Sequence, residues 1–215
     1  MTSPLGAAVP ELRRPHSFQA LIYVAAIAFS RRGNALAFGG RRDGAHQHRL
    51  DAAMTEPTTY DRLIELLQRH GAEFRLIDHP PEGRTDLVSP MRGHTTAAAA
   101  KCMIVMVKIG KRMKRFVLAV VPGNARIDVG AIKGLFGGTY AGFATPDDAE
   151  RLSKSVVGTV LPFAFDAELN LIVDPGVFEH PEIFFNAARL DRSVGMSSAD
   201  YRRIAEPRVE RIAVR

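Results

Sequence analysis

One segment of the chain is apolar on both of its faces, and this constrains the fold more than any other feature. Cys102 to Val107 reads CMIVMV, a run that suits a central strand with both faces covered. Gly110 and Lys111 then predict a turn, and Arg115 to Val121 predicts a second strand that runs back. We therefore expect the chain to fold around a hairpin in the middle of a sheet.

Helix and strand signals are interspersed through the rest of the chain from residue 54 onward. Thr58 or Thr59 predicts the start of a helix that Gly71 ends, and Glu73–Asp78 predicts a strand. The further expected elements are helices beginning near Asp128, at Thr145 with Pro146 and Asp148, and at Ser197 with Asp200, and strands over Leu169–Val173 and Ile183–Phe185. Because no regular βαβ rhythm is present, we expect a single α/β domain with a mixed sheet.

The first 53 residues differ from the rest in charge and pattern. They carry seven Arg against three acidic residues, which is +4 of the chain's net +6. Phe18–Phe29 is an apolar run suited to a signal-peptide core, but Arg31 and Arg32 follow it where such a peptide would be neutral. We expect residues 1–53 to be a poorly ordered basic extension, or an upstream over-extension of the reading frame with Met54 as the functional start. The functional domain is then 54–215.

The motifs that are missing exclude several classes of enzyme. With a single cysteine the chain has no internal disulfide and no thiolate zinc cluster, so a reducing compartment, the cytoplasm, is expected. The sequence contains no nucleophile elbow, no Walker loop, no dinucleotide-binding glycine motif and no HExxH zinc motif. Cys102, inside an apolar strand, suits a small core residue. We therefore expect no metal, no cofactor and no membrane partner.

Three features remain as candidates for chemistry, and each has two interpretations. Lys101 is either a strand-end lysine that reaches water or a cation at the mouth of a pocket. The segment Val157–Phe163 is either a strand and turn or a loop whose backbone N–H groups face a ligand. His79 is either a turn residue ahead of Pro80 and Pro81 or a residue of the site.

These residues, in this order, resemble the YbaK/ProX-type aminoacyl-tRNA deacylases, also called the prolyl-tRNA synthetase-associated editing domain. The resemblance runs from about Thr58 to Ala205. Its landmarks are His79-Pro80-Pro81, Ala99-Ala100-Lys101, Val121-Pro122-Gly123-Asn124 with Arg126-Ile127-Asp128, the G-x-x-x-P loop Gly158–Pro162, and Phe185–Asp191. The resemblance implies a partly barrel-like mixed sheet flanked by short helices, and metal-independent hydrolysis of the ester that links a wrong amino acid to tRNA.

The resemblance also implies roles for particular residues. Lys101 matches the lysine that the family needs, and Gly158 would help to orient the ester carbonyl through backbone N–H groups. The implied substrate-binding residues are His79, Thr159, Val160, Leu161 and Pro162. The attacking group would be water, aided by substrate hydroxyls. The implied partner is the acceptor end of aminoacyl-tRNA, with an aminoacyl-tRNA synthetase as a second candidate.

The sequence departs from the family pattern at several positions. Thr159 replaces a common Gly, Leu161 a common Ser or Thr, Ala188 a usual Gly and Asn124 a common Asp, which predicts a more apolar or narrower pocket. The alternative hypothesis is a binding module of the same fold that has lost hydrolysis.

A cluster of positive charge stands out in the turn between the two central strands. The cluster consists of Lys108, Lys111, Arg112, Lys114 and Arg115. It is either a candidate contact for tRNA or a solvated turn that keeps the chain in solution.

Overall fold

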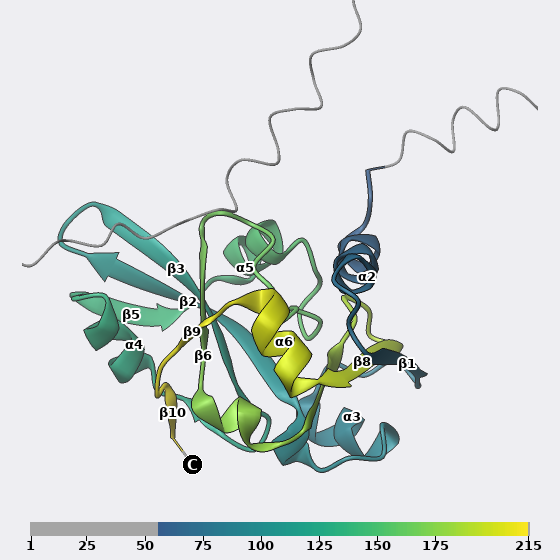
Figure 1. Cartoon of the computed structure of the whole chain (residues 1–215). Helices are drawn as coiled ribbons and strands as arrows, with labels where there is room; N and C mark the ends of the chain where they lie inside the picture. Colours follow the sequence, from purple (N-terminus) through teal and green to yellow (C-terminus); the bar gives the residue numbers. More distant parts are fainter. Residues whose placement is uncertain (1–55, 215) are drawn as a thin grey trace, which may run out of the picture. The chain divides into compact units, whose positions relative to one another are not determined.

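The computed structural model describes residues 56–214, so the expectations for residues 1–53 and for Met54 lie outside the described part of the chain. Figure 1 shows the arrangement of the elements. The helices are α2 (Thr59–Arg69), α3 (Thr85–Met91), α4 (Val129–Leu135), α5 (Pro146–Ser153) and α6 (Ser198–Ala205), with short 3-10 helices η2 (Thr96–Ala98) and η3 (Pro175–Glu179). The strands are β1 (Phe74–Asp78), β2 (Ala100–Ile109), β3 (Met113–Pro122), β4 (Arg126–Ile127), β5 (Tyr140–Phe143), β6 (Leu169–Val173), β7 (Glu182–Asn186), β8 (Arg192–Ser197), β9 (Arg208–Val209) and β10 (Ala213–Val214).

The predicted hairpin, β2 and β3, occupies the middle of the main sheet, whose order is β5-β2-β3-β6-β9. β2 is antiparallel to β3 and to β5, whereas β6 is parallel to β3, so the sheet is mixed as expected. A second, antiparallel sheet has the order β1-β8-β7, and β10 pairs with β4. A single bridge between Ala99 and Phe184 links β2 to β7. The described strands form no closed barrel. Of the partly barrel-like sheet that was expected, the two sheets show only this bridge.

The middle of the hairpin has buried side chains on both faces, which is what the apolar run predicts. One face carries Ile104 and Leu118 and packs in the larger core cluster with side chains of α2, α5 and α6. The other carries Val105 and Ala119 and packs with Ile132 of α4. Burying apolar side chains on both faces makes β2 and β3 the most constrained part of the fold, since each buried methylene contributes about 0.8 kcal/mol.

The helix starts were predictable because they depend on local hydrogen bonds. Thr58 and Asp61 form a capping box at α2, and the side chains of Asp128, Thr145 and Ser197 cap α4, α5 and α6. The elements that were not expected from the sequence include α3, β5 and β8. In β8, Ser193 is fully buried and hydrogen-bonded to the side chains of His79 and Asn186. The polar residues of β8 therefore interrupt the apolar pattern from which a buried strand would be predicted.

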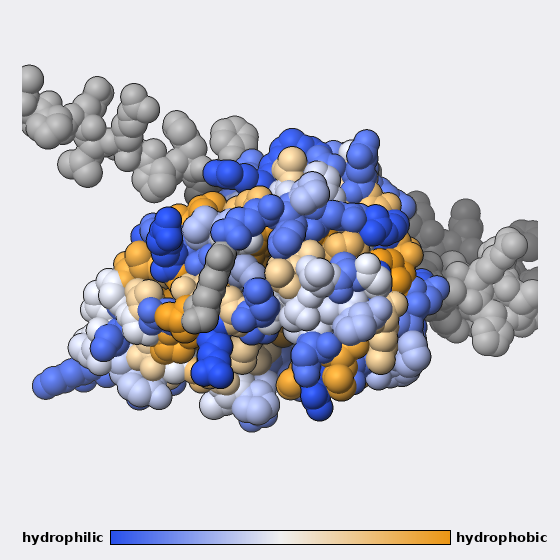
Figure 2. All heavy atoms as spheres, turned by 90° about the horizontal axis from the view of Figure 1, so that it is seen from below, coloured by the Kyte–Doolittle hydropathy of each residue, from blue (hydrophilic) through white to orange (hydrophobic). Residues whose placement is uncertain are grey.

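The described surface offers no element that would enter a bilayer as a helix. No helix among residues 56–214 is long and apolar enough to cross a membrane. The face in Figure 2 is mostly hydrophilic, with its hydrophobic patches separated by polar residues.

Candidate active site

A cavity of about 520 Å³ opens beside the first half of β2. β5 pairs with β2 from Val105 to Lys108, and the N–H of Ala144, just after β5, donates to the carbonyl oxygen of Ile104. The edge of β2 from Ala100 to Met103 is left without a strand partner on that side. The walls come from α3, from the segment Phe143–Glu150, from the loop Ser155–Val160 and from the end of β7. Its volume is in the range of small-ligand sites.

Lys101 and Gly158, the two residues expected to be catalytic, both line this cavity. The Lys101 ammonium donates hydrogen bonds to the carbonyl oxygens of Gly123, at 3.3 Å, and Ala125. Two of its three protons are thereby used, and one is left for a ligand. Burial, and to a smaller extent the charge of Arg126, lower the pKa of Lys101. The amino group is therefore a half-buried, fixed donor rather than a lysine that reaches into solvent.

The turn that holds Lys101 requires glycine at position 123. A Cβ there would lie 2.4 Å from the carbonyl oxygen of Thr96 and 3.0 Å from the Cβ of Ala99. Only a residue without a side chain lets the turn after β3 pack this closely against η2. The Val121–Asn124 landmark is thus explained by the packing that presents its carbonyls to Lys101.

Gly158 also needs to be glycine, for two reasons. Its φ is +88°, and a Cβ would lie 2.9 Å from the Cα of Gly83. The two glycines let the loop after α5 contact the turn before α3 backbone to backbone. The N–H of Gly158 has no acceptor among the described residues, and its carbonyl oxygen accepts a hydrogen bond from Asn186 Nδ2 at 2.9 Å.

Asn186, at the end of β7, is the polar centre of the site. It is buried, and its amide makes four hydrogen bonds. Nδ2 donates to the carbonyls of Gly158 and Glu82, at 2.9 and 3.0 Å, while Oδ1 accepts from Arg92 and, at 3.1 Å, from Ser193. Because every donor and acceptor of the amide is used, its orientation is fixed. Sequence analysis gave Asn186 no role, although a polar residue ending an apolar strand is a usable signal.

Arg92 is a second cation in the cavity wall that sequence analysis missed. It is 8% exposed, and burial lowers its pKa to about 10. One Nη donates to Asn186, whereas Nε is buried and has no acceptor in the described part of the chain. No carboxylate of the described residues forms an ion pair with it. Lys101 and Arg92 are two cations without a carboxylate partner among residues 56–214, in a lining that also contains Arg84, Asp86 and Glu150, and such cations suit oxygen-rich ligands.

A comparison with known proteins identifies the family of this chain. A family model described as "Aminoacyl-tRNA editing domain" matches residues 79–204. The chain belongs to this family. Within it, the chain is 39% identical over 150 residues to the "Multifunctional Ser/Thr-tRNA deacylase ProXp-y" of Escherichia coli K12, covering 69% of this chain and 89% of that protein. The expected resemblance is therefore confirmed.

Solved structures agree on the fold of this editing domain. The hypothetical protein APE2540 matches with a TM-score of 0.64 and 19% identity, over 71% of this chain and 99% of that one. A proposed trans-editing enzyme for prolyl-tRNA synthetase matches with a TM-score of 0.63 and 18% identity, over 75% and 100% of the two chains. At these identities the likeness concerns the fold alone.

Not every residue of the G-x-x-x-P loop lies where the family pattern led us to expect. Val160 lines the cavity, but Thr159, Leu161 and Pro162 are not among its lining residues. Thr159 is fully buried and bonds Val156 O at 2.9 Å, Leu161 packs in the core, and the Pro162 carbonyl accepts from the Tyr201 hydroxyl at 2.8 Å. The chain turns at Gly158 and then enters the core. The Leu161 side chain is therefore not part of the cavity wall, and the expectation of a more apolar or narrower pocket stays a prediction.

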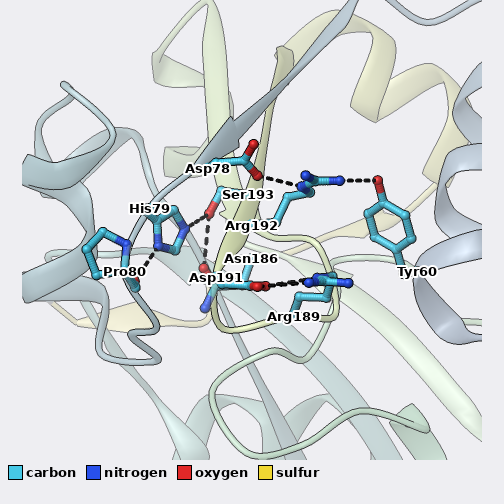
Figure 3. Close-up of polar contacts among 9 residues, drawn as sticks. All are labelled: Tyr60, Asp78, His79, Pro80, Asn186, Arg189, Asp191, Arg192 and Ser193. Carbon is cyan, nitrogen blue, oxygen red and sulfur yellow. Dashed lines mark hydrogen bonds and ion pairs between the residues drawn. The ribbon is translucent and has the colours of Figure 1, made fainter.

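His79 does not line the cavity either, and it is connected to the site by a hydrogen bond with Ser193 (Figure 3). Its Nε2 is 2.6 Å from Ser193 Oγ, and its Nδ1 is 2.8 Å from the carbonyl oxygen of Pro80. Through Ser193, His79 supports Asn186 from behind, so its geometry is that of a residue that acts through others.

Neither Cys102 nor a metal cluster adds chemistry to the described part of the site. Cys102 lines the cavity, but burial raises the pKa of its thiol, so the reactive thiolate is disfavoured. Among residues 56–214, no group of three or more His, Cys, Asp or Glu side chains could hold a metal ion.

Proposed function

We propose that this editing domain hydrolyses the ester of mischarged aminoacyl-tRNA without a metal, and that seryl and threonyl esters are its first candidate substrates. The relative named as a Ser/Thr-tRNA deacylase supports that choice of amino acids. One structural observation carries the proposal: Lys101 and Gly158 line the same cavity, each with an N–H group available to a ligand.

The reaction needs little more than orientation and hydrogen-bond donors. Water adds to the carbonyl carbon of the ester, and the bond from that carbon to the ribose oxygen breaks. The ribose oxygen takes up a proton, which leaves a free amino acid and a tRNA with its terminal hydroxyl restored. The third proton of Lys101 and the N–H of Gly158 stabilise the negative charge that develops on the carbonyl oxygen, and one such donor contributes about 3–4 kcal/mol.

The activation of water is assigned to hydroxyl groups of the substrate. His79 lies outside the cavity lining, and the Cys102 thiol stays protonated. An ester is an activated bond, so positioning together with oxyanion donors supplies much of the rate enhancement. A synthetase as a second partner stays a prediction.

A panel of mischarged tRNAs tests the proposal. The protein, dialysed against EDTA, is incubated with tRNAs that carry seryl, threonyl, alanyl and other groups, and the release of amino acid is measured. We expect release of at least one amino acid, its loss in Lys101→Ala, and no change in Arg69→Ala, which removes an exposed cation of α2. Binding without release from any member of the panel would favour the alternative, an inactive binding module.

A further inference from the structure

The end of the β2–β3 hairpin is a strongly positive ribbon that the fold leaves without acidic partners. It carries Lys108, Lys111, Arg112, Lys114 and Arg115, all of them exposed. The chain has no Asp or Glu between Asp86 and Asp128, and none of the ion pairs in the described residues includes a member of this cluster. The positive charge is therefore not neutralised within the described fold.

The hairpin end also carries a pairing that costs stability. Lys108 lies directly opposite Lys114 in the β2–β3 ladder, and like charges at opposed positions destabilise a sheet. β5 ends its pairing at Lys108 and β6 pairs with β3 only from Phe116, so the ribbon projects beyond both neighbours (Figure 1). A polyanion bound to the ribbon would relieve this repulsion.

Two exposed aromatic side chains connect the ribbon to the cavity. They lie on β5, at the edge of the sheet: Tyr140 is 53% exposed and Phe143 is 52% exposed. Lys108 Nζ lies 5.3 Å from the centroid of the Tyr140 ring, and Phe143 lines the cavity. A Cβ on Gly142 would lie 2.7 Å from the Tyr140 hydroxyl oxygen, so the Tyr140 ring lies over this glycine on the face of the sheet that also carries Lys108. Phe143 projects from the opposite face of the same edge strand.

Cations followed by exposed rings are the arrangement that binds single-stranded nucleic acid, because phosphates contact the cations and bases stack on the rings. The distance along β2 agrees with a ligand of this kind. Lys101 and Lys108 are seven residues apart on one strand, which is roughly 23 Å at about 3.3 Å per residue. Because this separation is odd, their side chains project from opposite faces of the sheet, and a ligand that contacts both must pass around the sheet edge at β5. An amino acid ester cannot reach from one to the other, whereas a polynucleotide end of about seven stacked nucleotides, at about 3.4 Å each, can.

We propose that β5 and the basic hairpin form the RNA-binding track of this protein. Tyr140 and Phe143 stack on unpaired bases at the 3′ end, and Lys108, Lys114 and their neighbours bind phosphates farther along the RNA. This proposal rests on the proposed function only in naming the bound RNA as tRNA. Binding itself is independent of hydrolysis, and the test separates the two.

The test measures the affinity of uncharged tRNA at several salt concentrations. Lys108→Gln/Lys114→Gln is compared with Arg69→Gln/Arg202→Gln, which removes the same charge from α2 and α6. We expect the hairpin variant to lose at least tenfold in affinity, and the slope of log K against log salt to fall by about 2, roughly one for each phosphate that is no longer bound by a lysine. The control pair keeps the affinity and slope of the wild type.

The aromatic residues are tested with tRNA that lacks its unpaired 3′ nucleotides. Tyr140→Ala and Phe143→Ala are each expected to weaken binding of intact tRNA about fivefold or more, as loss of one stacked base does. Neither variant changes the affinity for the shortened tRNA, whereas the Lys108/Lys114 variant weakens binding of both.

Hydrolysis of a seryl ester of adenosine separates this proposal from the proposed function. The ester lacks the rest of the RNA, so the hairpin variants hydrolyse it at the wild-type rate while their kcat/KM on mischarged tRNA falls. If the wild type hydrolyses no ester, the proposed function fails, but the binding measurements still decide on the track. The RNA-binding track is overturned if the hairpin variant keeps the wild-type affinity for tRNA. It is also overturned if the hairpin binds anionic vesicles and the protein does not bind tRNA.

Discussion

Asn186 Nδ2 donates a 2.9 Å hydrogen bond to the carbonyl oxygen of Gly158 and so joins strand β7 to the loop that borders the cavity. The same amide holds the carbonyl of Glu82 and accepts from the guanidinium of Arg92. A single buried side chain thus fixes three segments of the cavity wall relative to each other. Besides this hydrogen bond, the loop is held near Gly158 by its backbone contact with Gly83. The position of the Gly158 N–H therefore depends on the Asn186 amide.

Asn186→Ala is therefore expected to lower both stability and activity. It leaves the part-buried carbonyls of Glu82 and Gly158 without this donor, and a fully buried acceptor left without a donor costs about 1–3 kcal/mol. The free energy of unfolding from urea titration is expected to fall by about 2 kcal/mol or more. At a temperature where the variant is fully folded, kcat on mischarged tRNA should still fall at least tenfold. Wild-type kcat in the folded variant would contradict the positioning role.

Gly158→Ala should affect stability and activity, and Gly71→Ala provides its control. Both glycines have positive φ, +88° and +59°, but a Cβ at Gly71 meets nothing within 4 Å, whereas at Gly158 it meets Gly83. Backbone strain alone costs about 1–2 kcal/mol. The loss of chain flexibility in the unfolded state offsets about 0.4–1 kcal/mol of this, so we expect Gly71→Ala to lower the free energy of unfolding by about 0.5–1 kcal/mol with activity unchanged. Gly158→Ala should lower it further and abolish most deacylation. Equal activity of the two variants would be inconsistent with the site.

Lys101 gives the reaction a pH dependence of defined sign. Its pKa is lowered from 10.5, first by burial and then by Arg126, so the folded protein loses this proton at a lower pH than the unfolded chain. Between the two pKa values the unfolded state binds more protons, and the contribution of Lys101 to the free energy of unfolding rises with pH. Activity that needs the ammonium falls as pH rises through the folded pKa, below 10.5.

The measurement is the pH profile of enzyme-dependent deacylation after subtraction of spontaneous ester hydrolysis. Lys101→Arg keeps its charge to higher pH, so whatever activity it retains should lose its alkaline decline. The same alkaline decline in the wild type and in Lys101→Arg would show that another group titrates.

Ala188→Gly is expected to stabilise the protein. Ala188 has a φ of +56°, a conformation that costs a residue with a Cβ about 1–2 kcal/mol. The flexibility of glycine in the unfolded chain offsets about 0.4–1 kcal/mol of the gain. A net increase of about 0.5–1 kcal/mol should appear in urea or thermal unfolding. Ala187→Gly, which empties a fully buried position in the core, should instead destabilise.

The departures from the family pattern have different consequences in three dimensions. Ala188 stands where glycine is usual, and its positive φ shows that the backbone still adopts the glycine conformation. Leu161 has the opposite outcome, since its side chain lies in the core and leaves the cavity unchanged. A substitution in a motif can be noticed from the sequence, but the direction of its side chain cannot.

The amino-acid sequence by itself determined the central hairpin, the capped helices and the family, and it singled out Lys101 and Gly158, which both line the cavity. Each of these depends on local signals: hydrophobic pattern, side-chain caps, or a motif of fixed spacing. Only the tertiary structure decided that Arg92, Ser193 and Asn186 meet behind the cavity, because these contacts join residues as far as 94 positions apart. Hydrogen bonds between distant segments leave no period or spacing in a sequence, and they arise only when packing of the core brings the segments together.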